Sequence, residues 1–212
     1  MAASVPSGLP QPPGSVAIFA PMAHLPLRLR LATPLDDHEL YEFCRIHRDL
    51  RIERTADGEL VIMPPTGAET GRRNLELLVQ LGTWSKRDGR GVAFDSSTGF
   101  VLPNGAERSP DGAWVRKDRW EALTSDERRK FAPLCPDFVV ELCSPSDDRI
   151  ELGAKLEEYI GCGAQLGWLI DPERRRVEVY RSGRPPETLH DPATVRADPE
   201  LPGFELDMAS IW

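Results

Sequence analysis

The sequence is poor in cysteine and histidine, which excludes several kinds of metal and redox site. Among 212 residues there are four cysteines and four histidines. No two cysteines form a Cys-x-x-Cys pair and the histidines are scattered, so a structural zinc site is not expected. We expect the cysteines to be buried free thiols of a protein in a reducing cytoplasm.

The chain also lacks a hydrophobic run long enough to cross a bilayer, and no membrane association is expected. Residues 1–26 are rich in proline and alanine but have no basic start followed by an unbroken apolar core, so a secretory signal is not expected. Their composition predicts a flexible N-terminal arm, and residues 27–212 have the length of a single domain.

No glycine-rich loop of the P-loop or dinucleotide-binding type is present, and neither serine of the 144–146 segment has a histidine nearby in sequence. The net charge of −8 argues against a wholly basic nucleic-acid-binding surface. It is compatible with a local basic groove that faces an acidic site.

What is present is an alternation of helical and strand patterns that predicts an α/β (α+β) fold with a central mixed sheet flanked by helices. We expect helices over residues 36–48, 69–87, 124–131 and 150–161, and strands over residues 51–54, 59–63, 112–116, 138–143, 167–171 and 176–180, with a further strand within 89–100. Asp36 is the expected N-cap of the first helix. The expected apolar side of the second helix comprises Leu75, Leu78, Val79 and Leu81. The C-terminal tail, with four large apolar residues from Phe204 to Trp212, is expected to dock onto the core.

The most informative stretch covers residues 135–145, where two carboxylates, Asp137 and Glu141, stand within an apolar run. The run predicts a strand buried on both faces, where an unpaired carboxylate is costly. A second Pro-Asp pair ends at Asp111, just before another apolar segment. Two acids on adjacent strands suit one hard divalent cation such as Mg²⁺ or Mn²⁺. Taken alone, each acid is better explained by a structural role, Asp111 as a turn aspartate and Glu141 as an ion-paired strand residue, and it is their pairing that favours a metal site.

Two further residues complete the candidate site. Asp137 and Glu141 lie four residues apart on one face of a strand, about 13 Å from each other, too far to share an ion directly. Asp137 is therefore expected to cap the strand entry, with an accessory role at most. Lys155 lies on the helix after the strand and could supply the positive charge that phosphoryl chemistry needs. A solvated helix lysine is the alternative.

Seven short segments of the sequence resemble the Uma family of restriction endonucleases, within the PD-(D/E)XK nuclease superfamily. They are MPPTG at 63–67, FDSSTGF at 94–100, RSPD at 108–111, PDFVVE at 136–141, SPSD at 144–147, GWLIDP at 167–172 and LPGF at 201–204. The resemblance implies a restriction-endonuclease-like core and metal-dependent hydrolysis of a DNA phosphodiester. Asp111 matches the first acidic motif position and Glu141 the second.

The sequence departs from the pattern of that superfamily in two places. Cys143 stands where the usual lysine follows the second acid, so Lys155 would be a migrated lysine. A glutamate on an early core helix often completes such sites, and Glu69 is the candidate. The histidine that many relatives carry near this position is missing, so an exposed helix glutamate is the alternative.

The leading hypothesis is a Mg²⁺- or Mn²⁺-dependent DNA endonuclease in which Asp111 and Glu141 hold the metal and Lys155 acts beside them. The alternative is a catalytically inactive DNA-binding or interaction protein on a nuclease scaffold, which Cys143 and the acidic net charge favour. Hydrolysis of another phosphodiester is a third possibility. A homodimer is expected, because duplex-cutting enzymes often act in pairs and symmetric dimers are the commonest oligomers.

Overall fold

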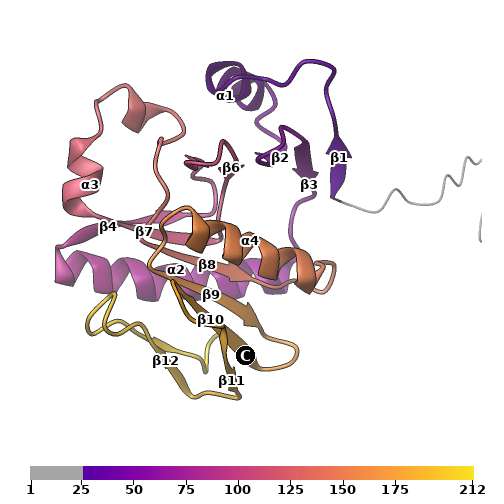
Figure 1. Ribbon diagram of the computed structural model, residues 1–212. Helices are drawn as coiled ribbons and strands as arrows, with labels where there is room; N and C mark the ends of the chain where they lie inside the picture. Colours follow the sequence, from indigo (N-terminus) through magenta and orange to yellow (C-terminus); the bar gives the residue numbers. More distant parts are fainter. Residues whose placement is uncertain (1–25) are drawn as a thin grey trace, which may run out of the picture.

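The structure, a computed structural model, describes residues 26–212. The arm expected over residues 1–26 therefore lies almost wholly outside the described residues. The remainder is built on two main sheets, with helices packed against the larger one (Figure 1). The expected fold class, a central mixed sheet flanked by helices, is confirmed.

The larger sheet has six strands in the order β11-β10-β9-β8-β7-β4. All neighbouring strands are antiparallel except β8 and β9. This one parallel pair needs a crossover connection, which is supplied by helix α4. The strands are β4 (Gly91–Asp95), β7 (Gly112–Arg116), β8 (Phe138–Leu142), β9 (Leu166–Asp171), β10 (Arg176–Arg181) and β11 (Glu187–His190).

The smaller sheet has five strands in the order β1-β3-β2-β6-β5, all antiparallel. Its centre is the predicted hairpin of β2 and β3, which turns at Gly58 with a positive φ of 85°. Gly58 adopts this left-handed conformation without the steric cost that a side chain would add. The strands are β1 (Leu27–Leu29), β2 (Arg51–Arg54), β3 (Leu60–Met63), β5 (Phe100–Val101) and β6 (Glu107–Arg108).

Strand β8 is buried along its whole length, as its apolar run predicts. Its alternate residues enter two different cores. Phe138 and Val140 pack with the buried residues of α2 (Ala68–Asp88), whereas Val139 packs with those of α4 (Arg149–Gly161). The two helices therefore cover opposite faces of the larger sheet. Glu141 has the same parity as Val139, so its side chain is directed to the α4 face.

The N-terminal helix and the C-terminal tail agree with the sequence-based expectations. Helix α1 (Asp37–Ile46) begins after Asp36, whose side chain accepts a hydrogen bond of 2.8 Å from the Glu39 amide in a capping box. The tail adds a two-stranded sheet of β12 (Thr194–Arg196) and β13 (Glu205–Asp207). Phe204 and Ile211 are buried in the core on the α2 face, which confirms that the tail docks.

Three expectations are corrected by the structure. On α2, Leu81 is buried and Leu78 packs against the core as expected, but Leu75 and Val79 are 61% and 54% exposed. Leu77 and Trp84 complete the face that meets the sheet. The charged helix expected over 124–131 is only a short 3₁₀ turn, Glu127–Arg129, and helix α3 (Lys117–Ala122) precedes it. Of the four free cysteines only Cys135 is fully buried. Among residues 26–212, no helix has both the length and the hydrophobicity that spanning a membrane requires.

Candidate active site

A cluster of buried charged side chains lies where the C-terminal end of β8 meets the smaller sheet. Its centre is Glu141, whose Oε1 is 2.9 Å from the Nζ of Lys155 on α4. The same Nζ is 2.8 Å from Oε1 of Glu53 on β2. Lys155 thus bridges one carboxylate from each sheet, and only 11% of its side chain is exposed. The structure brings together the predicted Glu141 and Lys155, and it adds Glu53, which the sequence analysis missed.

Glu53 is fixed by groups that follow it by more than fifty residues in the sequence. Its Oε1 accepts a hydrogen bond of 3.0 Å from the Ser109 amide, and its Oε2 is 3.3 Å from the Arg108 guanidinium. Arg108 is held in turn by Glu158 of α4, at 2.6 Å. Nothing in the local sequence distinguishes Glu53 from the exposed glutamate of an ordinary hairpin, because its burial results from the pairing of β2 with β6.

Asp111 is positioned directly before β7 and is tied to the same cluster. Its Oδ2 accepts a hydrogen bond of 2.9 Å from the amide of Leu142, the residue that follows Glu141. Its Oδ1 is 3.3 Å from a terminal nitrogen of Arg51 on β2. The hydrogen bond to the β8 backbone fixes Asp111 beside the strand end that carries Glu141. The two acids predicted from the sequence are therefore held side by side, Asp111 before the start of β7 and Glu141 near the end of the neighbouring strand β8.

The two carboxylates that share Lys155 have opposite pKa shifts. For Glu53, burial opposes ionisation, but the charges of Lys155 and two arginines outweigh it and lower the pKa to about 2. For Glu141, burial together with the negative charges of Asp111 and Glu53 outweighs Lys155 and raises the pKa to about 7. The pKa of Lys155 is raised, because its two carboxylate partners outweigh its burial. Lys155 is therefore a permanent cation, and Glu141 is the acid with too little positive charge around it.

A third carboxyl group, that of Glu107 on β6, lies near Glu53 and is completely buried. Burial and the nearby charge of Glu53 raise its pKa to about 8, so it keeps its proton at neutral pH. One of its oxygens, Oε2, has no hydrogen-bond partner. Its other oxygen lies so close to Gly99 that a β-carbon there would overlap it. This close approach is a physical reason for the glycine in the 94–100 segment.

Tyr159 of α4 completes the surroundings of Glu141. Its hydroxyl lies 3.3 Å from Glu141 Oε1 and donates a hydrogen bond to it, and its ring is fully buried. Burial, followed by the charges of Glu141 and Glu53, raises the pKa of this phenol well above its ordinary value. Tyr159 therefore acts as a fixed neutral donor that orients the Glu141 carboxylate.

The two accessory candidates lie apart from the cluster. Asp137, at the opposite end of β8, accepts a hydrogen bond of 2.8 Å from the Arg116 amide and pairs with Arg119 at 3.0 Å. These contacts join the entry of β8 to the end of β7. Glu69, in the first turn of α2, is exposed and pairs with two arginines of its own helix, Arg72 and Arg73. Within residues 26–212 neither acid forms a hydrogen bond or ion pair with Glu141 or Lys155.

The donor set suits a metal that takes few protein ligands. No group of three or more His, Cys, Asp or Glu side chains among the described residues is arranged to hold a metal ion. Asp111 and Glu141 could provide two carboxylates. Burial, and then the negative charges of Asp111 and Glu53, raise the pKa of Glu141, and a divalent cation would offset that negative charge. Mg²⁺ commonly binds through one or two carboxylates with water and substrate phosphate in the other positions. The two acids therefore fit Mg²⁺ or Mn²⁺.

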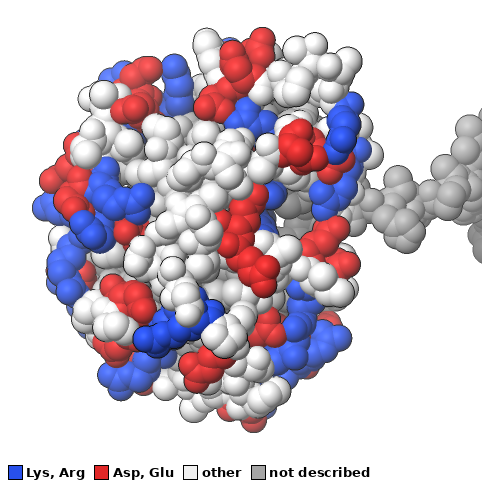
Figure 2. All heavy atoms as spheres, in the orientation of Figure 1, with Lys and Arg blue, Asp and Glu red and all other residues white. Residues whose placement is uncertain are grey.

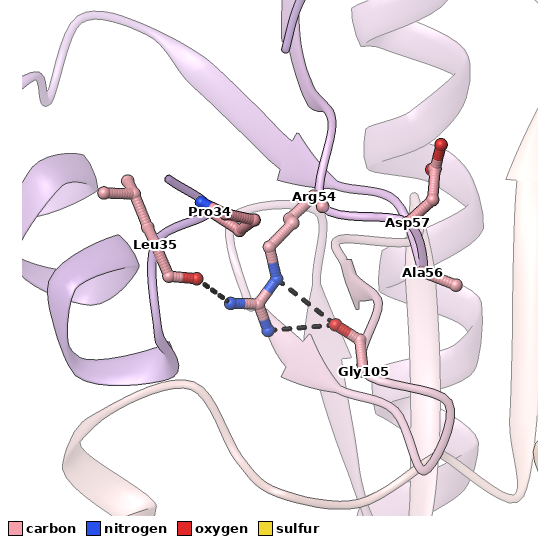
Figure 3. Close-up of a pocket in the computed structure, with 7 residues that line it drawn as sticks. Pro34, Leu35, Arg54, Ala56, Asp57 and Gly105 are labelled. Atoms are coloured by element: carbon pink, nitrogen blue, oxygen red, sulfur yellow. Dashed lines mark hydrogen bonds between the residues drawn. The ribbon is translucent and has the colours of Figure 1, made fainter. Parts of the chain in front are cut away.

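A surface pocket near the N-terminal part of the fold is a different feature (Figure 3). It has a volume of about 270 Å³ and is lined by residues that include Pro34, Asp57 and Gly105. Arg54 lies across it and donates hydrogen bonds to the carbonyl oxygens of Leu35 and Gly105. None of the cluster carboxylates lines this pocket, so its arginine serves to join chain segments.

Acidic and basic side chains are interspersed over the molecular face drawn in Figure 2, with a band of other residues between them. This face of the described residues has no broad patch of one sign, in keeping with the acidic net charge of −8. Recognition of a polyanion there would depend on individual cations near the acidic cluster and not on a general basic surface.

Comparison with known proteins identifies the family. No curated protein matches the chain. A crystal structure described as a putative nuclease of the DUF820 family from Anabaena variabilis matches with a TM-score of 0.69 and 18% sequence identity, over 84% of this chain and 97% of the other. At this identity the match concerns the fold. A model of the Uma2 family, described as "Putative restriction endonuclease", matches residues 37–209. The resemblance seen in the sequence is thus confirmed, and the chain belongs to the Uma2 family of nuclease-like proteins.

Proposed function

We propose that this protein is a metal-dependent endonuclease that hydrolyses phosphodiester bonds of DNA. The observation that carries the proposal is the pairing of the half-buried Asp111 with the buried Glu141 at adjacent strand ends, with Lys155 in direct contact with Glu141. Family membership supports the nuclease class. DNA as the substrate and the roles of the individual residues belong to the proposal.

Asp111 and Glu141 would hold the metal through their carboxylates. Bound Mg²⁺ or Mn²⁺ would polarise the phosphodiester and activate water for in-line attack at neutral pH. Leu142 fixes Asp111 through its backbone amide, and Tyr159 fixes Glu141 through its hydroxyl, so both acids are oriented before substrate arrives. Such preorganisation spares the reaction the cost of ordering these groups.

Lys155 would have an electrostatic role and a positioning role. It holds Glu53 and Glu141 within hydrogen-bonding distance of one ammonium group, which fixes the spacing between the two sheets at the site. Its permanent positive charge, close to the proposed metal ligands, would offset negative charge that develops on the phosphate in the transition state. Glu53 would keep Lys155 in place and is not assigned to the metal.

Cleavage assays on supercoiled and linear duplex DNA and on single strands, with Mg²⁺ or Mn²⁺, test the proposal. The isosteric variants Asp111→Asn and Glu141→Gln remove one proposed ligand each. Glu187→Gln, on the exposed edge strand β11, is the matched control because it loses the same charge away from the cluster. We expect cleavage by wild type and the control and loss of cleavage in both ligand variants. Cleavage that survives both ligand substitutions would contradict the assignment.

A non-catalytic nuclease scaffold that binds DNA or another partner is the second candidate. Cys143 occupies the usual lysine position, and Lys155 and Arg51 already neutralise part of the acidic charge in the absence of metal. Calorimetric titration with Mn²⁺ separates the two proposals. Binding that is lost in Asp111→Asn favours the enzyme, whereas no binding by a folded wild-type protein favours the scaffold.

We also propose that the protein is a homodimer. The exposed apolar side chains Leu75 and Val79, one turn apart on the outer side of α2, would be covered favourably by a second copy. Sedimentation equilibrium tests this. A monomer at micromolar concentration would contradict the proposal, whereas a dimer whose stability is unchanged in Leu75→Ser would contradict only the interface on α2.

A further inference from the structure

The cluster contains two cations next to its two proposed metal ligands, and they are held very differently. Lys155 is engaged by two carboxylates at 2.8 and 2.9 Å and is almost fully enclosed. Arg51 contacts Asp111 through a single longer interaction of 3.3 Å, and 34% of its side chain is exposed. Arg51 is therefore the cation that an incoming ligand can reach without breaking the buried ion pairs.

The hydrogen bonds of Arg51 leave part of its guanidinium unused. One terminal nitrogen faces Asp111, and the other donates to the carbonyl oxygen of Ser109. The Nε–H has no partner among the described residues but is itself buried, so an incoming ligand does not reach it. Each terminal nitrogen carries two N–H donors and uses one of them in these contacts, so one donor on each remains free. Arg51 is thus bound firmly enough to be oriented, yet retains capacity for another acceptor.

The two neighbouring arginines of the smaller sheet provide a contrast. Arg108 lies between Glu53 and Glu158, and 12% of its side chain is exposed. Arg54 donates to two carbonyl oxygens and also pairs with Asp37, and 7% of its side chain is exposed. Both are consumed by contacts within the fold. Arg51 differs from them in exposure, in its unused donors and in its position against a proposed metal ligand.

We propose that Arg51 is a substrate-binding residue, whose guanidinium binds a phosphate oxygen of the nucleic-acid backbone beside the Asp111 and Glu141 carboxylates. This inference rests on the proposed nuclease function and names the residue that would bring the phosphodiester to the site. Arginine suits this task because its planar fork can donate two hydrogen bonds to one phosphate. It also supplies an exposed positive charge at an acidic site that would otherwise repel DNA.

A purely structural role, in which Arg51 only neutralises Asp111, makes different predictions. Loss of such a contact would lower thermal stability and leave the affinity for DNA unchanged. Loss of a phosphate contact would weaken DNA binding and reduce its salt dependence. Addition of free guanidinium would restore part of the activity only if the missing group acts on the substrate.

The experiment compares wild type with Arg51→Gln, Arg51→Lys and the control Arg184→Gln. Arg184 is exposed and follows β10, whose C-terminal end pairs with the start of β9, so it lies at the far end of the sheet from Glu141. Binding of a short fluorescein-labelled DNA duplex is measured by anisotropy in Ca²⁺ over a range of salt concentrations. Cleavage kinetics are measured in Mn²⁺, with and without millimolar guanidinium chloride, and thermal melting verifies folding.

For Arg51→Gln we expect about a tenfold or greater rise in Kd and in KM, and a salt-dependence slope that is smaller by about 1. Arg51→Lys should be intermediate, Arg184→Gln should match wild type, and guanidinium should raise the cleavage rate of Arg51→Gln alone. If wild type cleaves DNA and Arg51→Gln keeps its Kd and KM within twofold, the Arg51 assignment is overturned while the nuclease function stands. If folded wild type neither binds nor cleaves DNA, the proposed function fails and this inference fails with it.

Discussion

The two ends of β8 each present a buried carboxylate, yet their surroundings differ. Asp137, at the start of the strand, has a backbone amide and an arginine to itself. Glu141, at the other end, must share Lys155 with Glu53 and also lies near the charge of Asp111. A buried acid with partners of its own, such as Asp137, stabilises the fold. A buried acid that must share its cation, such as Glu141, is the one that we propose to bind a metal ion.

The comparison predicts that the largest effect on activity will come from the Glu141 end. Glu141→Gln should reduce DNA cleavage in Mn²⁺ by about a thousandfold or more, because one of the two proposed metal ligands is lost with little change in shape. The Asp137→Asn protein should retain cleavage when assayed below its melting temperature. Equal losses in the two folded proteins would remove the distinction between the two ends.

The largest effect on stability should come from the Asp137 end. Asp137→Ala leaves the Arg116 amide without its acceptor and Arg119 without its partner, which should cost about 2–3 kcal/mol of unfolding free energy. For a chain of this size the melting temperature should fall by about 5–10 °C. Calorimetry or circular dichroism measures the change. A melting temperature within about 1 °C of wild type would refute the structural role of Asp137.

Glu107 sharpens the comparison, because it shows what burial, and then a neighbouring acid, do to the pKa of a carboxyl group that has no ion-pair partner among the described residues. Its pKa is raised from 4.5 to about 8, so the folded protein keeps a proton that the unfolded chain has released above about pH 4.5. This group therefore makes stability fall as pH rises from about 4.5 to about 8, by at most about 1.4 kcal/mol per pH unit. Glu141, with its pKa raised to about 7, contributes in the same direction.

We expect Glu107→Gln to weaken that pH dependence, so that the variant gains stability relative to wild type as pH rises from 5 to 8. Urea unfolding at several pH values measures the difference, and Glu187→Gln serves as the exposed control. A constant difference between variant and wild type across this range would show that Glu107 does not hold a proton in the folded state.

The smallest effect is expected for Glu69, which is exposed and paired only within its own helix. Glu69→Gln should change the cleavage rate by less than about twofold, since surface ion pairs contribute little and the cluster does not depend on this side chain. A loss comparable to that of Glu141→Gln would instead support the accessory role that the sequence pattern suggested for Glu69.

The end of β8 could be predicted from the sequence because its signals are local. A continuous apolar run with a glutamate inside it indicates a buried strand with a costly charge, and strand alternation then directs that charge to one face. The following helix, which brings Lys155 back over the strand, is expected from the sequence over residues 150–161 and is observed as α4, Arg149–Gly161. Asp111 required only that the strand after it pair with β8, which it does.

Glu53 and the buried face of α2 could not be obtained in the same way. Glu53 is buried because β6, more than fifty residues later, pairs with its strand and brings Ser109 and Arg108 to it. On α2, the expected side of Leu75, Leu78, Val79 and Leu81 overlaps the buried face of Leu77, Leu81 and Trp84, and both have helical spacing. Periodicity cannot choose between two apolar stripes on one helix, since the sheet on which the helix packs decides which is covered.

The parallel crossover from β8 through α4 to β9 has a consequence for protein design. Because α4 returns over the same strand end, a cation can be delivered to Glu141 either from the strand or from the helix. Cys143 lies two residues after Glu141, on the same face, and Lys155 contacts Glu141 from the helix. The positive charge beside Glu141 therefore comes from the helix in this protein, and the strand position two residues after the acid is a second place from which a designed lysine could supply it.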